Sequence, residues 1–167
     1  LVFIVVMIVM GLNQGMQPIA GYNFGAKLYG RVNKVLRLTI IYATAVTTFG
    51  FLVGMLVPDL VVGIFTSDAE LTELSVTGLR ITVMFFPIIG FQMVTSNFFQ
   101  SIGMAGKAIF LSLTRQMLIL LPCLLVLPQF FGVAGVWYSM PVSDLLASLI
   151  ALVMLVCQFR KSRTSPL

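Results

Sequence analysis

The residue of this chain best placed for chemistry is Asp144, a carboxylate about midway along the last long apolar segment. A charged group inside a bilayer is costly, so an acid there usually faces a partner, a water-filled cavity or an ion pathway. Pro141 lies one turn earlier and cannot donate a hydrogen bond to the carbonyl of Trp137, which loosens the helix. The pattern predicts a carboxylate that takes up H+ or binds Na+. The alternative is that Asp144 only pairs with Arg115 or accepts a bond from a neighbouring hydroxyl.

Arg115 is the second charged candidate. It lies in the preceding apolar segment, about two helical turns from Lys107. A long cationic side chain in that place either extends to the membrane interface as an anchor or approaches a carboxylate within the bundle. Both interpretations are open, and only the second makes Arg115 part of an ion site.

A polar stripe follows the third apolar segment. Gln92, Ser96 and Gln100 lie within about 80° of one another if each residue advances by about 100°, whereas Asn97 lies to one side. A polar stripe on a membrane helix either binds adjacent helices or lines a passage. We expect the stripe to belong to a substrate or ion pathway.

Amide side chains also follow the aliphatic residues 1–10. Gln14, Gln17 and Asn23 occur within a single predicted span that also contains Pro18. An amide in hydrocarbon costs free energy unless it faces protein or water, which predicts that this helix lines a cavity. Since proline bends membrane helices, we expect hinges at four positions: Pro18, Pro87, Pro122 and Pro141.

The elements that position these side chains are membrane helices. The chain is 59% hydrophobic and 9% charged, against about 25% charged residues in soluble domains. Because continuous apolar runs of about 20 residues span a bilayer as helices, the expected fold is an all-α polytopic membrane bundle of five transmembrane helices. The predicted spans are residues 1–25, 36–64, 76–102, 108–129 and 132–158. Residues 1–158 form the bundle, and 159–167 form a basic tail.

Charge separates the connections into two sets. The first and third connections and the tail are basic, whereas the second is acidic and the fourth is uncharged. Because Lys and Arg collect on the cytoplasmic side, we expect the N-terminus outside and the C-terminus in the cytoplasm. A short external helix is expected to begin at Thr66 or Ser67. The net charge of +5 follows these positions and predicts contact with membrane lipids and not with nucleic acid.

Other chemistries find no support in the sequence. Histidine is absent, and Cys123 and Cys157 lie singly in apolar runs, so we expect no metal site and no cofactor. No nucleophile, base and orienting group occur together, so an enzyme is not expected. Because the chain opens with Leu1 inside an apolar run, we expect it to be a piece of a longer protein.

The segment from Gln14 to Lys27, with Arg31 after it, resembles the eighth membrane helix of MATE (multidrug and toxic compound extrusion) transporters. It looks most like the bacterial branch with the DNA-damage-inducible and staphylococcal members. Weaker matches follow in the family's order: Phe86-Pro87, Gln100 to Lys107, Arg115-Gln116 with Pro122, and Gly132 to Trp137.

The resemblance implies a twelve-helix antiporter of two lobes that exports cationic or amphipathic drugs in exchange for H+ or Na+ by alternating access. The chain would be helices eight to twelve, in a bacterial cytoplasmic (inner) membrane, and its partner would be the missing N-terminal lobe with the seventh helix. Some members carry an acid in the tenth helix that this sequence lacks, which counts against a Na+ site in this lobe. The alternatives are a lipid-linked sugar flippase of the same superfamily and a non-transporting membrane scaffold or assembly subunit.

Overall fold

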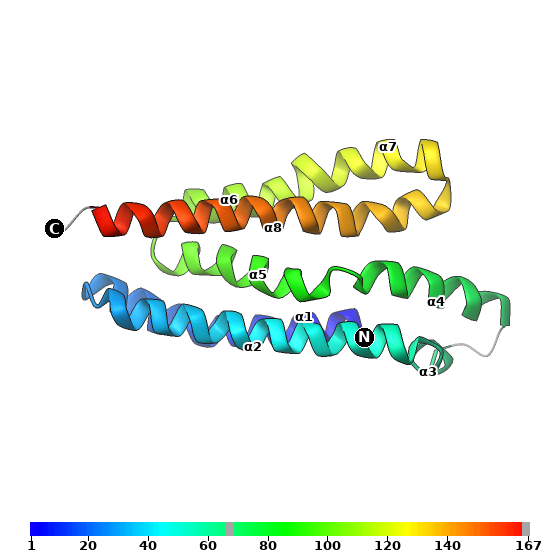
Figure 1. Cartoon of the computed structure of the whole chain (residues 1–167), viewed down its shortest axis with the longest axis horizontal. Coiled ribbons are helices and arrows are strands. Elements are labelled where there is room, and N and C mark those ends of the chain that lie inside the picture. Colours follow the sequence, from blue (N-terminus) through cyan, green and yellow to red (C-terminus); the bar gives the residue numbers. More distant parts are fainter. Residues whose placement is uncertain (66–68, 165–167) are drawn as a thin grey trace.

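The computed structural model describes residues 1–65 and 69–164 and shows an elongated bundle of antiparallel helices (Figure 1). The fold class predicted from composition is confirmed. The helices of the described part are α1 (Val2–Gly25), α2 (Tyr29–Leu56), α3 (Pro58–Gly63), α4 (Ala69–Val83), α5 (Phe86–Ser101), α6 (Ala105–Leu113), the π-helix η1 (Thr114–Leu120), α7 (Leu121–Phe131) and α8 (Val133–Thr164). The helix start predicted at Thr66 or Ser67 lies outside the described residues.

Four helical segments of the described chain are long and apolar enough to cross a membrane. They are Val2–Gly25, Tyr29–Leu56, Ala105–Phe131 and Val133–Arg160. A fifth crossing arises if Leu71–Val83 and Phe86–Ser101, which meet at 50°, form one bent span. With that pair counted as one span, the number of crossings equals the five apolar segments predicted from the sequence.

The predicted boundaries of the second span were wrong. The prediction placed the helix at residues 36–64, but α2 begins at Tyr29 and ends at Leu56. Lys and Arg are good helix formers, so the helix continues through the basic residues that mark the edge of the hydrocarbon. Pro58 ends α2 because its ring clashes with a carbonyl one turn back, and it begins the short helix α3 instead.

The third and fourth spans are interrupted, and proline accounts for the interruptions. Pro87 lies in the first turn of α5, and its ring cannot approach the carbonyl of Val83, which is the last residue of α4. Pro122 lies in the first turn of α7, two residues after the end of η1. Pro18 and Pro141, by contrast, lie inside the continuous helices α1 and α8.

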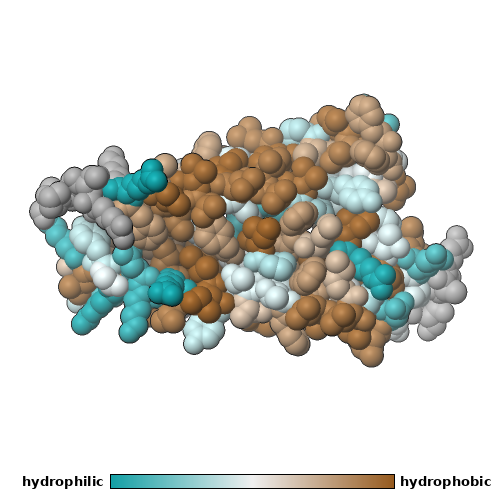
Figure 2. Space-filling view, viewed as in Figure 1, coloured by the Kyte–Doolittle hydropathy of each residue, from teal (hydrophilic) through white to brown (hydrophobic). Residues whose placement is uncertain are grey.

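Helix α5 lies at the centre of the bundle (Figure 1). It packs against α1 and α2 on one side and against α6 and α8 on the other. Gly90 makes the α2 contact possible, because a Cβ atom there would lie 2.7 Å from Thr47 Oγ1 and 2.9 Å from the carbonyl oxygen of Ala43. Buried residues of the main core include Val9, Phe98 and Phe99. Figure 2 shows the complementary outer surface, which is mostly hydrophobic along the middle of the molecule.

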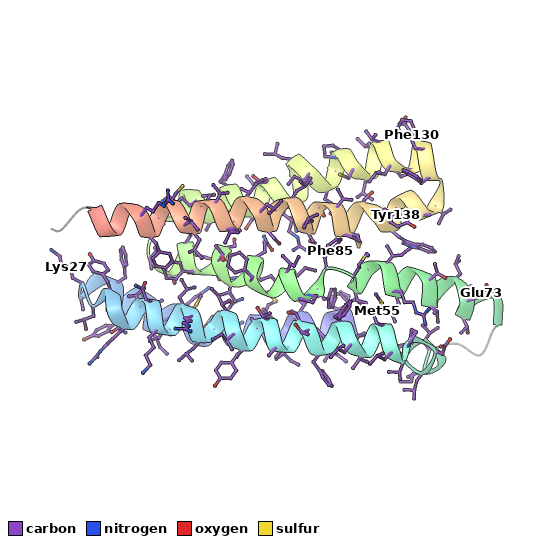
Figure 3. All side chains as sticks on the ribbon, in the orientation of Figure 1. Lys27, Met55, Glu73, Phe85, Phe130 and Tyr138 are labelled. Carbon is purple, nitrogen blue, oxygen red and sulfur yellow. The ribbon has the colours of Figure 1, made fainter. Side chains whose placement is uncertain are left out.

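The basic connections meet at one end of the bundle. The α1–α2 turn, the α5–α6 connection and the C-terminal part of α8 lie together there, whereas α3 and the α7–α8 turn lie at the opposite end (Figure 1). Lys27, labelled in Figure 3, marks the basic end. Residues 159–164 of the predicted tail continue α8 as helix. The grouping of the basic residues is that expected from charge, and the orientation in the membrane stays a prediction.

Candidate functional site

An ion pair joins η1 to α8. Arg115 Nη2 lies 2.7 Å from Asp144 Oδ1, and Arg115 Nε donates a hydrogen bond of 2.7 Å to the same oxygen. The Asp144 side chain is 6% exposed and that of Arg115 is 32% exposed. Of the alternatives for Arg115, the structure shows the pair with a carboxylate and not the extended anchor.

The pair is electrostatically balanced as long as both partners are present. Two opposite charges in contact lose less free energy on burial than either would alone, because each replaces part of the other's hydration. Removal of either charge leaves the other in apolar surroundings without compensation. Because both contacts are to Oδ1, Arg115 leaves the second carboxylate oxygen to other partners, and a proton or cation bound to Asp144 would weaken the attraction to the guanidinium group.

Small hydroxyl side chains surround Asp144 on α8. Ser148 Oγ donates to the backbone carbonyl of Asp144 at 2.6 Å, and Ser143 Oγ donates to that of Met140 at 2.8 Å. Ser139 Oγ donates to the carbonyl of Gly135 at 2.7 Å. Ser139, Ser143 and Ser148 are buried. These bonds satisfy the hydroxyl groups locally and leave the carboxylate oxygen Oδ1 to Arg115.

The π-helix places Arg115 at the pair. Seven residues, Thr114–Leu120, form wide turns between α6 and α7, and such turns in helices often occur at functional sites. The Thr114 hydroxyl is buried and has no hydrogen-bond partner among the described residues. Sequence reasoning missed this element. The only signal was Pro122, which cannot donate to the carbonyl of Leu118 and so permits irregular geometry before it.

The stripe predicted on α5 passes through three environments. Gln92 is 4% exposed, and its Oε1 atom has no partner in the described part of the chain. Ser96 Oγ lies 3.2 Å from Ser112 Oγ of α6, so the two hydroxyls share a hydrogen bond. Gln100 is exposed near the basic end. The stripe is therefore partly a contact between helices and partly surface.

The predicted amide side chains of α1 also lie in different environments. Gln17 Nε2 donates to Asn97 Oδ1 of α5 at 3.1 Å, and Asn97 Nδ2 donates to the carbonyl of Met93 at 2.9 Å. Gln14 is exposed, whereas Asn23 is buried and donates to the carbonyl of Ile19 at 2.8 Å. Asn97, which lies beside the predicted stripe, is thus the residue that receives the α1 amide. Helical periodicity alone could not assign it, because the rotation of α5 depends on packing.

Asn13 is a further polar residue that sequence reasoning missed. Its side chain is 2% exposed, and neither Oδ1 nor Nδ2 has a hydrogen-bond partner in the regions that the structure describes. It lies one turn before Gln17 on the buried face of α1. The available signal was this spacing, which puts both amides on one side of the helix.

The predicted site residues therefore form separate contacts. Gln17–Asn97 joins α1 to α5, Ser96–Ser112 joins α5 to α6, and Arg115–Asp144 joins η1 to α8. Among the described residues, no group of three or more His, Cys, Asp and Glu side chains could hold a metal ion. The ion pair is the one of these contacts that can exchange a proton or a monovalent cation.

Known proteins are similar to this chain in sequence. The family model described as MatE matches residues 1–126. The multidrug export protein MepA of Staphylococcus aureus (strain MSSA476) is 26% identical over 147 residues, which cover 88% of this chain and 32% of MepA. MepA of Staphylococcus saprophyticus is 22% identical over the same length.

Solved structures agree with the fold. The MATE multidrug transporter DinF-BH is 38% identical with a TM-score of 0.86, and the match covers 91% of this chain and 34% of that protein. The Vibrio cholerae MATE transporter VcmN in its bent form has a TM-score of 0.85 at 20% identity, covers 95% of this chain and 36% of VcmN, and supports the fold alone. The chain spans about a third of the length of the relatives it matches.

Proposed function

The chain belongs to the MatE family, and on this premise we propose that it is part of a secondary active antiporter that exports cationic or amphipathic drugs in exchange for H+ or Na+. The observation that supports the coupling role is the ion pair between Arg115 and the buried carboxylate of Asp144. The names of the relatives, a multidrug export protein and a multidrug transporter, support drugs as the substrate class.

Alternating access is the proposed mechanism. The rest of the relatives' length would supply the opposite wall of the substrate cavity, as an N-terminal lobe with a seventh helix. Residues 1–158 would act as one rocking unit in a bacterial cytoplasmic membrane, with the N-terminus outside and the basic residues 159–167 in the cytoplasm. The broken span at Val83 and Phe86 and the π-helix η1 would let this unit change shape without unfolding.

In this proposal Asp144 has two states. Paired with Arg115, it is neutralised within the protein; protonated or bound to Na+, it releases the guanidinium group. In the same proposal, polar side chains of α1 and α5 would form the substrate or ion pathway: Gln14, Gln17, Asn23, Gln92, Ser96 and Gln100. Hinge motion would use Pro18, Pro87, Pro122 and Pro141.

Ethidium efflux from a drug-sensitive bacterial host that expresses the complete gene product tests the proposal. We expect efflux that stops when either the proton gradient or the sodium gradient is collapsed, and the effective treatment identifies the coupling ion. Export of a lipid-linked sugar without ethidium efflux would identify a flippase instead. Absence of both activities at normal membrane expression would leave a scaffold or assembly subunit and overturn the proposal.

A further inference from the structure

A pocket of about 480 Å³ opens at the basic end of the bundle. Its walls come from the end of α1, the beginning of α2, the last turns of α5 and the C-terminal part of α8. The described residues that line it are Phe24, Tyr29, Val32, Asn33, Phe98, Ile102, Val156, Gln158, Phe159 and Arg160. None of them belongs to the Arg115–Asp144 pair or to the amide contacts of α1 and α5.

The polar groups of this pocket are suited to an anion. Arg160 and the side chains of Tyr29 and Asn33 can all donate hydrogen bonds. Lys107 Nζ, which can only donate, bonds the oxygen of Gln158, so the amide NH₂ group of Gln158 stays available as a donor. No acidic side chain is among the described residues of the lining.

The rest of the lining is apolar and largely aromatic. Phe24 and Tyr29 pack edge to face with ring centroids 5.7 Å apart. Phe98 is buried against the core, whereas Val156 is exposed and forms the outer wall on α8. A small soluble anion would leave this apolar surface without a partner, and a hydrocarbon chain would cover it. The pocket therefore combines donors for an anion with a surface for an acyl chain.

The position of the pocket also fits a lipid. The spans Val2–Gly25 and Val133–Arg160 both end beside it, where lipid headgroups meet the protein. Further cationic residues of the described part lie in the α1–α2 turn, in the first three turns of α2 and in the first turn of α6: Lys27, Arg31, Lys34, Arg37 and Lys107. Figure 2 shows hydrophilic residues gathered at this end and an apolar surface beyond them.

We propose that this pocket is a binding site for an anionic phospholipid, whose phosphate group binds at Arg160 and Gln158 and whose acyl chain lies against Phe24, Phe98 and Val156. Arg160 disfavours a cationic amphiphile electrostatically, and a zwitterionic lipid, whose net charge is zero, gains less from this side chain than an anionic lipid does. The proposal does not depend on drug export, because lipid binding is measured without transport.

Native mass spectrometry of the intact protein, purified and titrated with phosphatidylglycerol, tests the site. Arg160→Gln removes a donor from the pocket, and Arg31→Gln removes the same charge from an exposed position outside it. Val156→Trp fills the outer wall, and Val153→Trp adds the same bulk to an exposed position of α8 that does not line the pocket. Phosphatidylethanolamine and glycerol phosphate serve as the zwitterionic and soluble comparisons.

We expect Arg160→Gln to weaken phosphatidylglycerol binding by roughly fivefold, the effect of about one cation near an anionic headgroup. Val156→Trp weakens it at least as much, while Arg31→Gln and Val153→Trp leave it nearly unchanged. Equal losses for Arg160→Gln and Arg31→Gln would overturn the proposal in favour of diffuse charge attraction. Retention by Val156→Trp, equal binding of phosphatidylethanolamine, or equal binding of glycerol phosphate would each overturn it as well.

Discussion

Arg115 donates through both Nε and Nη2 to a single oxygen of Asp144, although the two residues are 29 positions apart and belong to different helices. Two donors on one oxygen hold the carboxylate firmly, and both contacts must break before Asp144 can separate from Arg115. The pair is therefore the part of the bundle in which a change of ionic partner would have the largest local effect.

Asp144→Asn removes the charge but keeps the size of the side chain. In the complete protein we expect ethidium efflux to fall to near background, because the amide cannot take up H+ or bind Na+ as a carboxylate does. Efflux is measured at matched membrane expression. Asp59→Asn, on the exposed surface of α3, serves as the control and keeps full activity. Normal efflux by Asp144→Asn would remove Asp144 from the coupling mechanism.

Exchanging the charges of Arg115 and Asp144 distinguishes a structural role of the ion pair from a role in ion coupling. We expect Asp144→Arg alone and Arg115→Asp alone to reduce the folded yield, since each places two like charges together. The double variant restores the ion pair and much of the yield, as measured by size-exclusion chromatography in detergent. Its efflux stays low, because the carboxylate then lies on η1 and not on α8. Full recovery of efflux would show that the pair has only a structural role.

The Gln17–Asn97 hydrogen bond should contribute modestly to stability. A double-mutant cycle of Gln17→Leu and Asn97→Leu is expected to give a coupling free energy of roughly 0.6 kcal/mol, the average for hydrogen bonds between membrane helices. Thermal unfolding in detergent provides the measurement. Gln14→Leu, at an exposed position of the same helix, should show no coupling to Asn97→Leu. Additive effects of Gln17→Leu and Asn97→Leu would contradict the contact.

Gly90→Ala tests the close approach of α5 and α2. The added Cβ would lie within 3 Å of both Thr47 Oγ1 and the carbonyl oxygen of Ala43, so the helices must separate. We expect a loss of about 1–3 kcal/mol in the free energy of unfolding, as for other overpacked interiors. Gly11→Ala, where no atom lies within 4 Å of the new Cβ, should be neutral or slightly stabilising. Equal effects of the two substitutions would disprove the contact.

Asn13→Leu tests the one residue of α1 whose whole side-chain amide is buried without a partner among the described residues. Replacement of an unsatisfied amide by an apolar group of similar size removes a desolvation cost of about 1–3 kcal/mol. We therefore expect a higher unfolding temperature. A lower one would indicate that Asn13 binds internal water or a polar group in the complete protein.

Sequence reasoning predicted the helical architecture well because hydrocarbon imposes it. A run of about 20 apolar residues has one stable solution in a bilayer, so the apolar membrane helices and the grouping of basic turns followed from composition and charge. The beginning of α2 at Tyr29 could not be predicted from hydrophobicity, because charged residues end a hydrophobic run without ending a helix.

The details of the site were less accessible. The sequence identified Asp144 and proposed Arg115 as one possible partner, but it could not choose between pairing and anchoring. It missed Asn97 and Asn13 because the rotation of each helix is set by packing with its neighbours. It also missed the π-helix at Arg115, which depends on hydrogen bonds across wide turns and is indicated in the sequence by Pro122 alone.

The central position of α5 has a consequence for the order in which the bundle is assembled. Helices α1 and α2 pack extensively with each other, and so do α7 and α8. Helices α4 and α5 lie between the two hairpins. They contact the first hairpin on one side and α8 of the last hairpin on the other. During synthesis the first hairpin can therefore form as soon as it enters the bilayer, and the last hairpin then docks on α4 and α5, which precede it in the chain.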